Sequence, residues 1–179
     1  MTAPDSSAAV LLSDSLGRVR DDVLDVVAGL EVDQLAWRPD EESNSIAWLV
    51  WHLTRVEDDH LADVAGIEQV WTSQGWYDRF ALPFPPRAHG WGHSAAEVAE
   101  VRATADLLAS YHAAVAEMAL GYVGSLEPSD LDRIVDERWD PPVSLAVRLV
   151  SVVNEVNQHL GQAAYLRGLV ERGSLGWSR

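Results

Sequence analysis

The sequence predicts an all-α fold, a four-helix bundle with long loops at one rim. Four long segments repeat apolar residues at the helical period, and residues typical of helix ends flank these segments. The connections between them are irregular and rich in aromatic residues. Apolar residues make up 47% of the 179 residues, which is enough for a substantial core. We expect a single domain over residues 1–179, because helices with short and long links of this kind form bundles.

The first two helices are expected over residues 8–29 and 45–65. Gly29 is a plausible stop for the first helix. The polar run 43–45 offers N-cap residues for the second helix, and Gly66 is placed to end it. Both segments carry an apolar stripe, so both should pack against the core.

The third and fourth helices are expected over residues 94–120 and 143–171. Ser94 and Glu97 form the pattern of a capping box at the start of the third helix. Ser144 is placed to cap the fourth helix. The fourth helix is apolar over most of its length, which predicts that it is largely buried.

The links carry an unusual number of aromatic residues. The link between the second and third helices contains "GWYDRFALPFPPRAHGWGH", and a short helix is expected over residues 67–76. The next link should hold a helical turn and an extended piece around Ile134–Trp139. Long loops are often functional, and aromatic side chains in loops indicate that these loops dock on the bundle.

The composition excludes several classes of function. The formal net charge is −15, and the thirteen basic residues are all arginine. Such an acidic surface repels phosphate backbones and anionic membranes, so we expect neither nucleic acid nor membrane as a partner. The chain has no cysteine, which excludes disulfides, thiolate ligands and a cysteine nucleophile. With no signal-peptide pattern and no long apolar span, we expect a cytoplasmic protein.

A polar constellation interrupts the apolar fourth helix. Glu155 and His159 are four residues apart and therefore share a helix face. His52 lies among apolar residues of the second helix. If these two helices are neighbours, the three side chains can converge. Two imidazoles and a carboxylate are the ligand pattern of catalytic zinc, and also of non-haem iron enzymes.

Other polar residues lie near this constellation. Gln162 and Arg148 continue the line of Glu155 on the fourth helix, and Asp59 lies near the face of His52. Asp59 could accept a hydrogen bond from a ligand histidine. In the sequence "HGWGH", His93 either marks the entry into the third helix or lies at the rim above the site.

Three further polar features have a simpler interpretation. His60 and His112 lie among charged or small residues and are expected to be solvent-exposed. The charged run 57–59 is also expected to be solvent-exposed, apart from Asp59. The polar line itself could be a hydrogen-bond network within a plain bundle, since buried polar groups need partners.

The segments "NSIAWLVWHLTRVEDDH", "GWGHS" and "NQHLGQAAYLRGL" resemble the DinB-like superfamily. They most closely resemble its thiol-dependent branch, which includes mycothiol-dependent maleylpyruvate isomerase and mycothiol S-transferases. The resemblance implies a divalent metal, zinc with nickel as the alternative, held by His52, Glu155 and His159. The isomerase has an additional C-terminal domain, whereas this sequence stops soon after the fourth helix, so we do not expect maleylpyruvate isomerisation itself.

The expected function is therefore that of a metal-dependent enzyme that uses a low-molecular-weight thiol, mycothiol or a similar one, in S-transfer to a small electrophile or in its isomerisation. In this interpretation Gln162 and Asp59 orient ligands, and Arg148 receives a substrate carboxylate. Trp48 and His93 are expected to contact the cofactor. The alternatives are a non-haem iron oxygenase and a metal-stabilised bundle that binds a ligand or partner in a stress response without catalysis.

We predict that the protein is a homodimer. Many aromatic residues lie outside the predicted helices, and a second copy could cover the apolar surface that they leave. Light scattering at micromolar concentration should give twice the monomer mass of 19.6 kDa. A monomer at that concentration would contradict the prediction.

Overall fold

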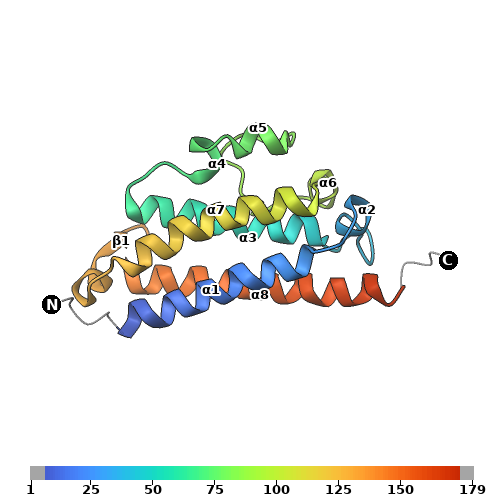
Figure 1. The fold of residues 1–179 in the computed structure, drawn as a ribbon. Helices are drawn as coiled ribbons and strands as arrows, with labels where there is room; N and C mark the ends of the chain where they lie inside the picture. The colour runs from blue at the N-terminus through green and yellow to red at the C-terminus, as the bar shows by residue number, and fades with distance from the viewer. Residues whose placement is uncertain (1–6, 174–179) are drawn as a thin grey trace.

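The computed structural model describes residues 7–173 and confirms an all-α bundle (Figure 1). The four long helices are α1 (Ser7–Val27), α3 (Ile46–Ala65), α7 (Ala105–Gly124) and α8 (Leu145–Glu171). Helices α1 and α3 each pack against both α7 and α8. The helices therefore follow the order α1, α7, α3, α8 around the core, and α3 and α8 are neighbours, as the candidate site requires.

Shorter elements occupy the links between the long helices. These elements are α2 (Val32–Leu35), α4 (Val70–Ser73), α5 (Trp76–Phe80), α6 (Ala95–Glu100), the 3₁₀ helix η1 (Pro128–Asp132), and strands β1 (Ile134–Asp136) and β2 (Val143–Ser144). The two strands pair in antiparallel orientation. The expected extended piece is thus one strand of a small hairpin that leads into α8.

The expected helix ends are formed by local hydrogen bonds. The Ser45 hydroxyl accepts a hydrogen bond from the amide of Trp48 at 3.1 Å. Gly66 ends α3 in the left-handed conformation, with φ of 68°, which glycine adopts without a steric penalty. Ser144 caps α8 through the amide of Val147. The boundaries of α3 and α8 therefore follow from short sequence signals.

The prediction of one helix over residues 94–120 is wrong. Ser94 and Glu97 do form a capping box, but α6 ends where Val101 is extended (φ −80°, ψ 92°). Thr104 then caps α7 by accepting from the amide of Leu107. Val101 is fully buried in this break. Burial of this β-branched side chain in an extended segment outweighs the continuous helical pattern.

The aromatic residues of the link over 67–93 dock on the bundle, as expected, apart from the exposed Trp91. Trp71, Trp76 and Phe80 are buried. Their rings lie 5.1, 5.6 and 5.7 Å from the ring of Tyr111 on α7, measured between centroids. Aromatic contacts of this kind add to the stabilisation from burial.

A buried ion pair on α3 holds the link over 67–93 in place through hydrogen bonds. Arg55 and Asp58 are both fully buried. The Arg55 guanidinium donates to the carbonyl of Ala88 at 3.1 Å and to the side chain of Gln69 at 2.9 Å. The Asp58 carboxylate accepts from the amides of Val70 and Trp71, each at 2.8 Å. Both ends of the link are thereby bound to one turn of α3.

The expectation that residues 57–58 and His112 are solvent-exposed is wrong. Every residue of α3 from Ile46 to Asp58 is buried. Other parts of the chain cover α3 on all sides, which sequence periodicity cannot reveal. His112 of α7 faces Glu57, with its Nδ1 3.8 Å from Oε2 of the carboxyl and 3.1 Å from the Thr54 hydroxyl.

Burial keeps this inner pair uncharged. It raises the pKa of Glu57 to about 8 and lowers the pKa of His112 to about 4. Glu57 Oε2 and His112 Nε2 have no hydrogen-bond partner within residues 7–173. A charge on either group would be costly there, so both are neutral at pH 7.

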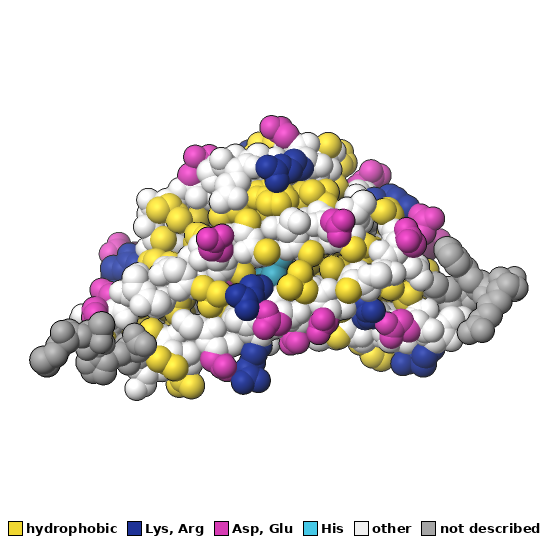
Figure 2. Space-filling model, in the orientation of Figure 1, with side chains coloured by type: hydrophobic (Ala, Val, Ile, Leu, Met, Phe, Trp, Pro, Cys, Tyr) yellow, Lys and Arg dark blue, Asp and Glu magenta, His cyan; other side chains and the backbone are white. Residues whose placement is uncertain are grey.

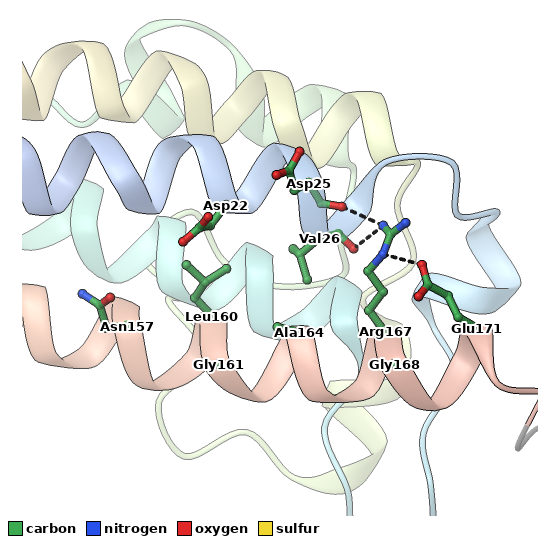
Figure 3. Close-up of a pocket in the computed structure, with 10 residues that line it drawn as sticks. All are labelled: Asp22, Asp25, Val26, Asn157, Leu160, Gly161, Ala164, Arg167, Gly168 and Glu171. Carbon is green, nitrogen blue, oxygen red and sulfur yellow. Dashed lines mark hydrogen bonds and ion pairs between the residues drawn. The ribbon is translucent and has the colours of Figure 1, made fainter.

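A groove between α1 and α8 lies on another flank of the bundle (Figure 3). Arg167 of α8 crosses it and donates to the carbonyl groups of Asp25 at 2.7 Å and Ala28 at 2.8 Å, at the end of α1. The same side chain binds Glu171 at 2.8 Å. These carbonyls lack partners inside the helix, so Arg167 supplies the C-terminal cap that α1 needs.

None of the helices within residues 7–173 is long and apolar enough to cross a membrane. Acidic side chains are spread over the visible face, with arginines between them, and do not gather in one patch (Figure 2).

The buried Glu57 predicts an unusual pH dependence of stability. Its carboxyl ionises above about 4.5 in the unfolded chain but only near 8 in the folded protein. A raised folded-state pKa favours the folded state at low pH, and this advantage is lost as the pH rises from 4.5 to 8. Glu57→Gln should therefore raise the free energy of unfolding by about 3 kcal/mol at pH 7 and by little at pH 5.

Denaturant unfolding at several pH values measures this difference. The matched control is Glu117→Gln on α7, where the side chain is exposed. It should change stability little at any pH. Parallel stability curves for the wild type and Glu57→Gln would contradict a neutral buried carboxyl.

Candidate metal centre

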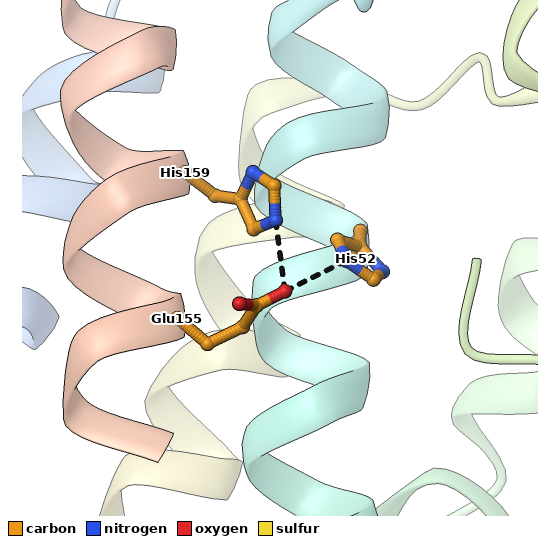
Figure 4. A group of neighbouring side chains, drawn as sticks. All are labelled: His52, Glu155 and His159. Atoms are coloured by element: carbon orange, nitrogen blue, oxygen red, sulfur yellow. Dashed lines mark hydrogen bonds and ion pairs between the residues drawn. The ribbon is translucent and has the colours of Figure 1, made fainter. Parts of the chain in front are cut away.

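Three side chains from two neighbouring helices converge at one point (Figure 4). His52 comes from α3, and Glu155 and His159 come from successive turns of α8. Within residues 7–173 they form the one group of this kind, with one candidate ligand atom from each lying within 4.8 Å of the others. Glu155 Oε1 is 3.1 Å from His159 Nε2 and 3.6 Å from His52 Nε2. The expected convergence is present, while metal binding by these residues stays a prediction.

Hydrogen bonds fix the orientation of both imidazoles. The Nδ1 of His52 lies against the carbonyl oxygen of His89 and donates to it. The Nδ1 of His159 is 3.0 Å from Oε1 of Gln162, which can only accept. His52 therefore carries a proton on Nδ1 and directs its Nε2 toward the shared point. The Nε2 of His159 faces the same point, 3.1 Å from Glu155 Oε1. Such acceptors behind the ring are typical of histidines that bind metal.

The local electrostatics favour a metal ligand at His52. Its side chain is 5% exposed, and burial lowers its pKa to about 4. The imidazole is therefore neutral near pH 7, which is the form that binds a metal. Two imidazoles and one carboxylate fit the ligand preferences of zinc.

A glycine allows the loop to approach His52 closely. Gly90 has φ of 97°, and a Cβ built there would lie 2.7 Å from His52 Nδ1 and 3.2 Å from the ring of Trp48. A larger residue would therefore displace the imidazole or the His89 carbonyl that orients it. Gly90 is needed both for its backbone conformation and for the space that it leaves.

A cleft of about 310 Å³ opens beside the cluster. His52 and Glu155 line it, together with Ser151 of α8 and with His89 and Trp91 of the loop. Trp91 is 84% exposed at the mouth. The α1–α8 groove is larger, at about 540 Å³, but none of the three converging residues lines it. The smaller cleft is the place where a substrate could reach the cluster.

Trp48 and His93, the residues expected to contact a cofactor, form the packing behind His52. The Trp48 ring stacks on His52 at 4.6 Å between centroids, and its Nε1 donates to His93 Nδ1 at 3.3 Å. His93 lies against the Trp51 ring at 5.7 Å. Neither Trp48 nor His93 is among the described residues that line the cleft, where His89 and Trp91 lie instead.

The three residues expected in catalytic roles, Gln162, Asp59 and Arg148, differ in how they lie relative to the cluster. Gln162 Oε1 lies 3.0 Å from His159 Nδ1, and a role for Gln162 in catalysis stays a prediction. Asp59 lines the cleft, but its carboxylate accepts from the Gln69 side chain at 2.7 Å and not from a histidine of the cluster. The group that accepts the hydrogen bond of His52 is the His89 carbonyl. The sequence did not predict this acceptor, because every residue has a backbone carbonyl. Only the glycines of "HGWGH" hinted at a close backbone approach.

Arg148 is bound within the protein. Its guanidinium donates to the Asp136 carboxylate at 3.1 Å and to His60 Nδ1 at 3.3 Å. Asp136 also binds Arg138 at 2.8 Å. Arg148 therefore joins α8 to β1 and to α3. Its guanidinium was expected to receive a substrate carboxylate, but here it contacts Asp136 and His60.

Comparisons with known proteins place these features in context. A family model described as Mycothiol-S-transferase matches residues 11–172. A crystal structure of a conserved protein from Enterococcus faecalis has the same fold, with a TM-score of 0.86 and 32% sequence identity. The match covers 92% of this chain and 98% of that chain. The comparison with curated proteins finds no match.

The close approach at Gly90 predicts an effect on metal affinity. If the cluster binds zinc, Gly90→Ala should weaken that binding at least about tenfold, because the new methyl group displaces His52 or the carbonyl behind it. Titration against a chromogenic zinc chelator measures the affinity.

The matched control is Gly92→Ala in the same loop. Gly92 also has positive φ, at 77°, but a Cβ there meets no atom within 4 Å. This variant suffers similar backbone strain without touching His52. Equal zinc affinity in the two variants would show that the contact with Gly90 does not matter.

Proposed function

Because the chain belongs to the mycothiol S-transferase family, we propose that it is a metal-dependent enzyme that joins mycothiol to a small electrophile. The observation that carries this proposal is the His52–Glu155–His159 cluster beside an accessible cleft. The chain has no cysteine, so a sulfur nucleophile has to come from a cosubstrate.

The ligands would be His52 Nε2, His159 Nε2 and a Glu155 carboxylate oxygen. A divalent metal held there, which we propose to be zinc, would lower the pKa of a thiol and so favour the thiolate at neutral pH. Two imidazoles and a carboxylate also suit non-haem iron. The family match favours thiol chemistry, and metal analysis of the purified protein distinguishes the two.

The protein's own residues orient the reaction. Gln162 and the His89 carbonyl hold the two imidazoles, and Trp48 packs against His52. Trp91 at the mouth of the cleft is placed to cover a bound electrophile. In the reaction, the thiol proton passes to solvent, a sulfur–carbon bond forms, and the leaving group departs with its electron pair.

Conjugation should depend on Glu155. We expect metal-loaded protein to accelerate the reaction of mycothiol with a reactive aryl halide, and a chelator to abolish the acceleration. Glu155→Gln keeps the shape of the side chain but removes its charge, so it should lower metal affinity and rate at least about tenfold while the protein stays folded.

The matched control is Glu171→Gln. This substitution is on the same helix, but Glu171 binds Arg167 away from the cluster. It should leave metal content and rate unchanged. If metal-loaded wild type reacts no faster than free thiol, with mycothiol and with other thiols, the protein is a binding bundle and not a transferase.

A further inference from the structure

One flank of α8 is polar along most of the helix. The residues on this flank recur at intervals of three and four, which places them on one side of the helix. They are Arg148, Ser151, Glu155, Gln158, Gln162 and Tyr165. The buried face of α8 is apolar throughout, so the polar flank is not needed for the core.

Three hollows follow one another along this flank. The first, at Arg148, has a volume of about 380 Å³. The second is the cleft at Ser151 and Glu155. The third has a volume of about 650 Å³ and is lined by Gln158, Gln162 and Tyr165 of α8. The candidate metal centre thus lies between a charged hollow and a larger one, which we call the amide hollow.

The amide hollow combines hydrogen-bonding groups with the apolar side chains of Pro39, Leu49 and Leu166, a mixture that suits a ring carrying hydroxyl groups. Its far wall is formed by Glu42, Ser43 and Asn44 from the link between α2 and α3. Amides, hydroxyls and a carboxylate offer donors and acceptors that match alcohol groups. Tyr165 is 66% exposed and presents a ring on which a sugar could pack. No Arg or His is among the described residues that line the hollow.

The amide hollow is joined to the candidate metal centre through α8. Gln162 lines the hollow and also binds His159 Nδ1 at 3.0 Å. Gln158 follows Glu155 by three residues, which is about 4.5 Å along the helix axis, and Tyr165 lies about 15 Å from Glu155. A ligand with its sulfur at the metal centre could therefore extend over Gln158 toward Tyr165.

We propose that the amide hollow binds the hydroxyl-rich body of the thiol cosubstrate, with Gln158 as a hydrogen-bonding residue and Tyr165 as a packing surface. This proposal rests on the proposed function, in which the thiol is mycothiol, a cysteine derivative of a glucosamine–inositol. The sugar and the inositol are neutral and rich in hydroxyl groups, which can pair with the amides and hydroxyls of the lining. A volume of about 650 Å³ is within the range of small-molecule sites.

The test uses a probe that has the body of the thiol but no sulfur, N-acetylglucosaminyl-inositol. Calorimetry with full-length, metal-loaded protein should detect binding to the wild type. Gln158→Leu should weaken binding about tenfold, as expected for lost hydrogen bonds. The matched control is Asn157→Leu, because Asn157 is the preceding residue and lines the α1–α8 groove. It should bind the probe as the wild type does.

A second readout uses two thiols. The ratio of kcat/KM for mycothiol to kcat/KM for N-acetylcysteine should fall about tenfold in Gln158→Leu and stay constant in Asn157→Leu. If the probe does not bind, or binds equally to both variants, the amide hollow is not the site even where the wild type conjugates mycothiol. If the probe binds in a Gln158-dependent manner but no thiol is conjugated, the binding site in the amide hollow is confirmed and the proposed transferase function is wrong.

Discussion

The buried Arg55–Asp58 pair is the interaction on which the site depends. An ion pair without solvent needs hydrogen bonds to nearly all of its polar atoms, and here the segment over 67–93 supplies most of them, while Tyr111 of α7 donates to Asp58 at 2.9 Å. Arg55 binds the carbonyl of Ala88, and Asp58 binds the amides at the start of α4. Because Ala88 is held in this way, the next carbonyl, that of His89, is fixed against His52. The orientation of a candidate metal ligand is thereby determined by an ion pair one turn further along α3.

Helix α3 can carry these groups because it is enclosed. Its residues from Ile46 to Asp58 are buried, so each polar side chain among them is paired or kept uncharged. His52 is neutral and oriented by a carbonyl, Arg55 is paired with Asp58, and Glu57 is protonated. An enclosed helix also holds its side chains in fixed rotamers, which suits a ligand that must meet two residues of another helix.

Helix α8 contributes in a different way. One face belongs to the core, and the flank beside it is polar and open to three hollows. Glu155 and His159 lie where this flank meets α3. The arrangement combines a rigid support with access for ligands, and it explains why a helix that reads as core in the sequence carries amides and a carboxylate.

The sequence by itself determined three of the four long helices, most of their caps, and the pairing of Glu155 with His159, because helical period and capping act over a few residues. It also identified His52 as unusual among apolar neighbours. Only the tertiary structure decided that α3 is enclosed and Glu57 is buried, that the helix predicted over 94–120 breaks at Val101, and that the His89 carbonyl and Gly90 define the orientation of His52. These features depend on segments that are distant in the chain, and a backbone carbonyl is the same chemical group at every residue. Its partner is therefore known only when the loop is placed in space.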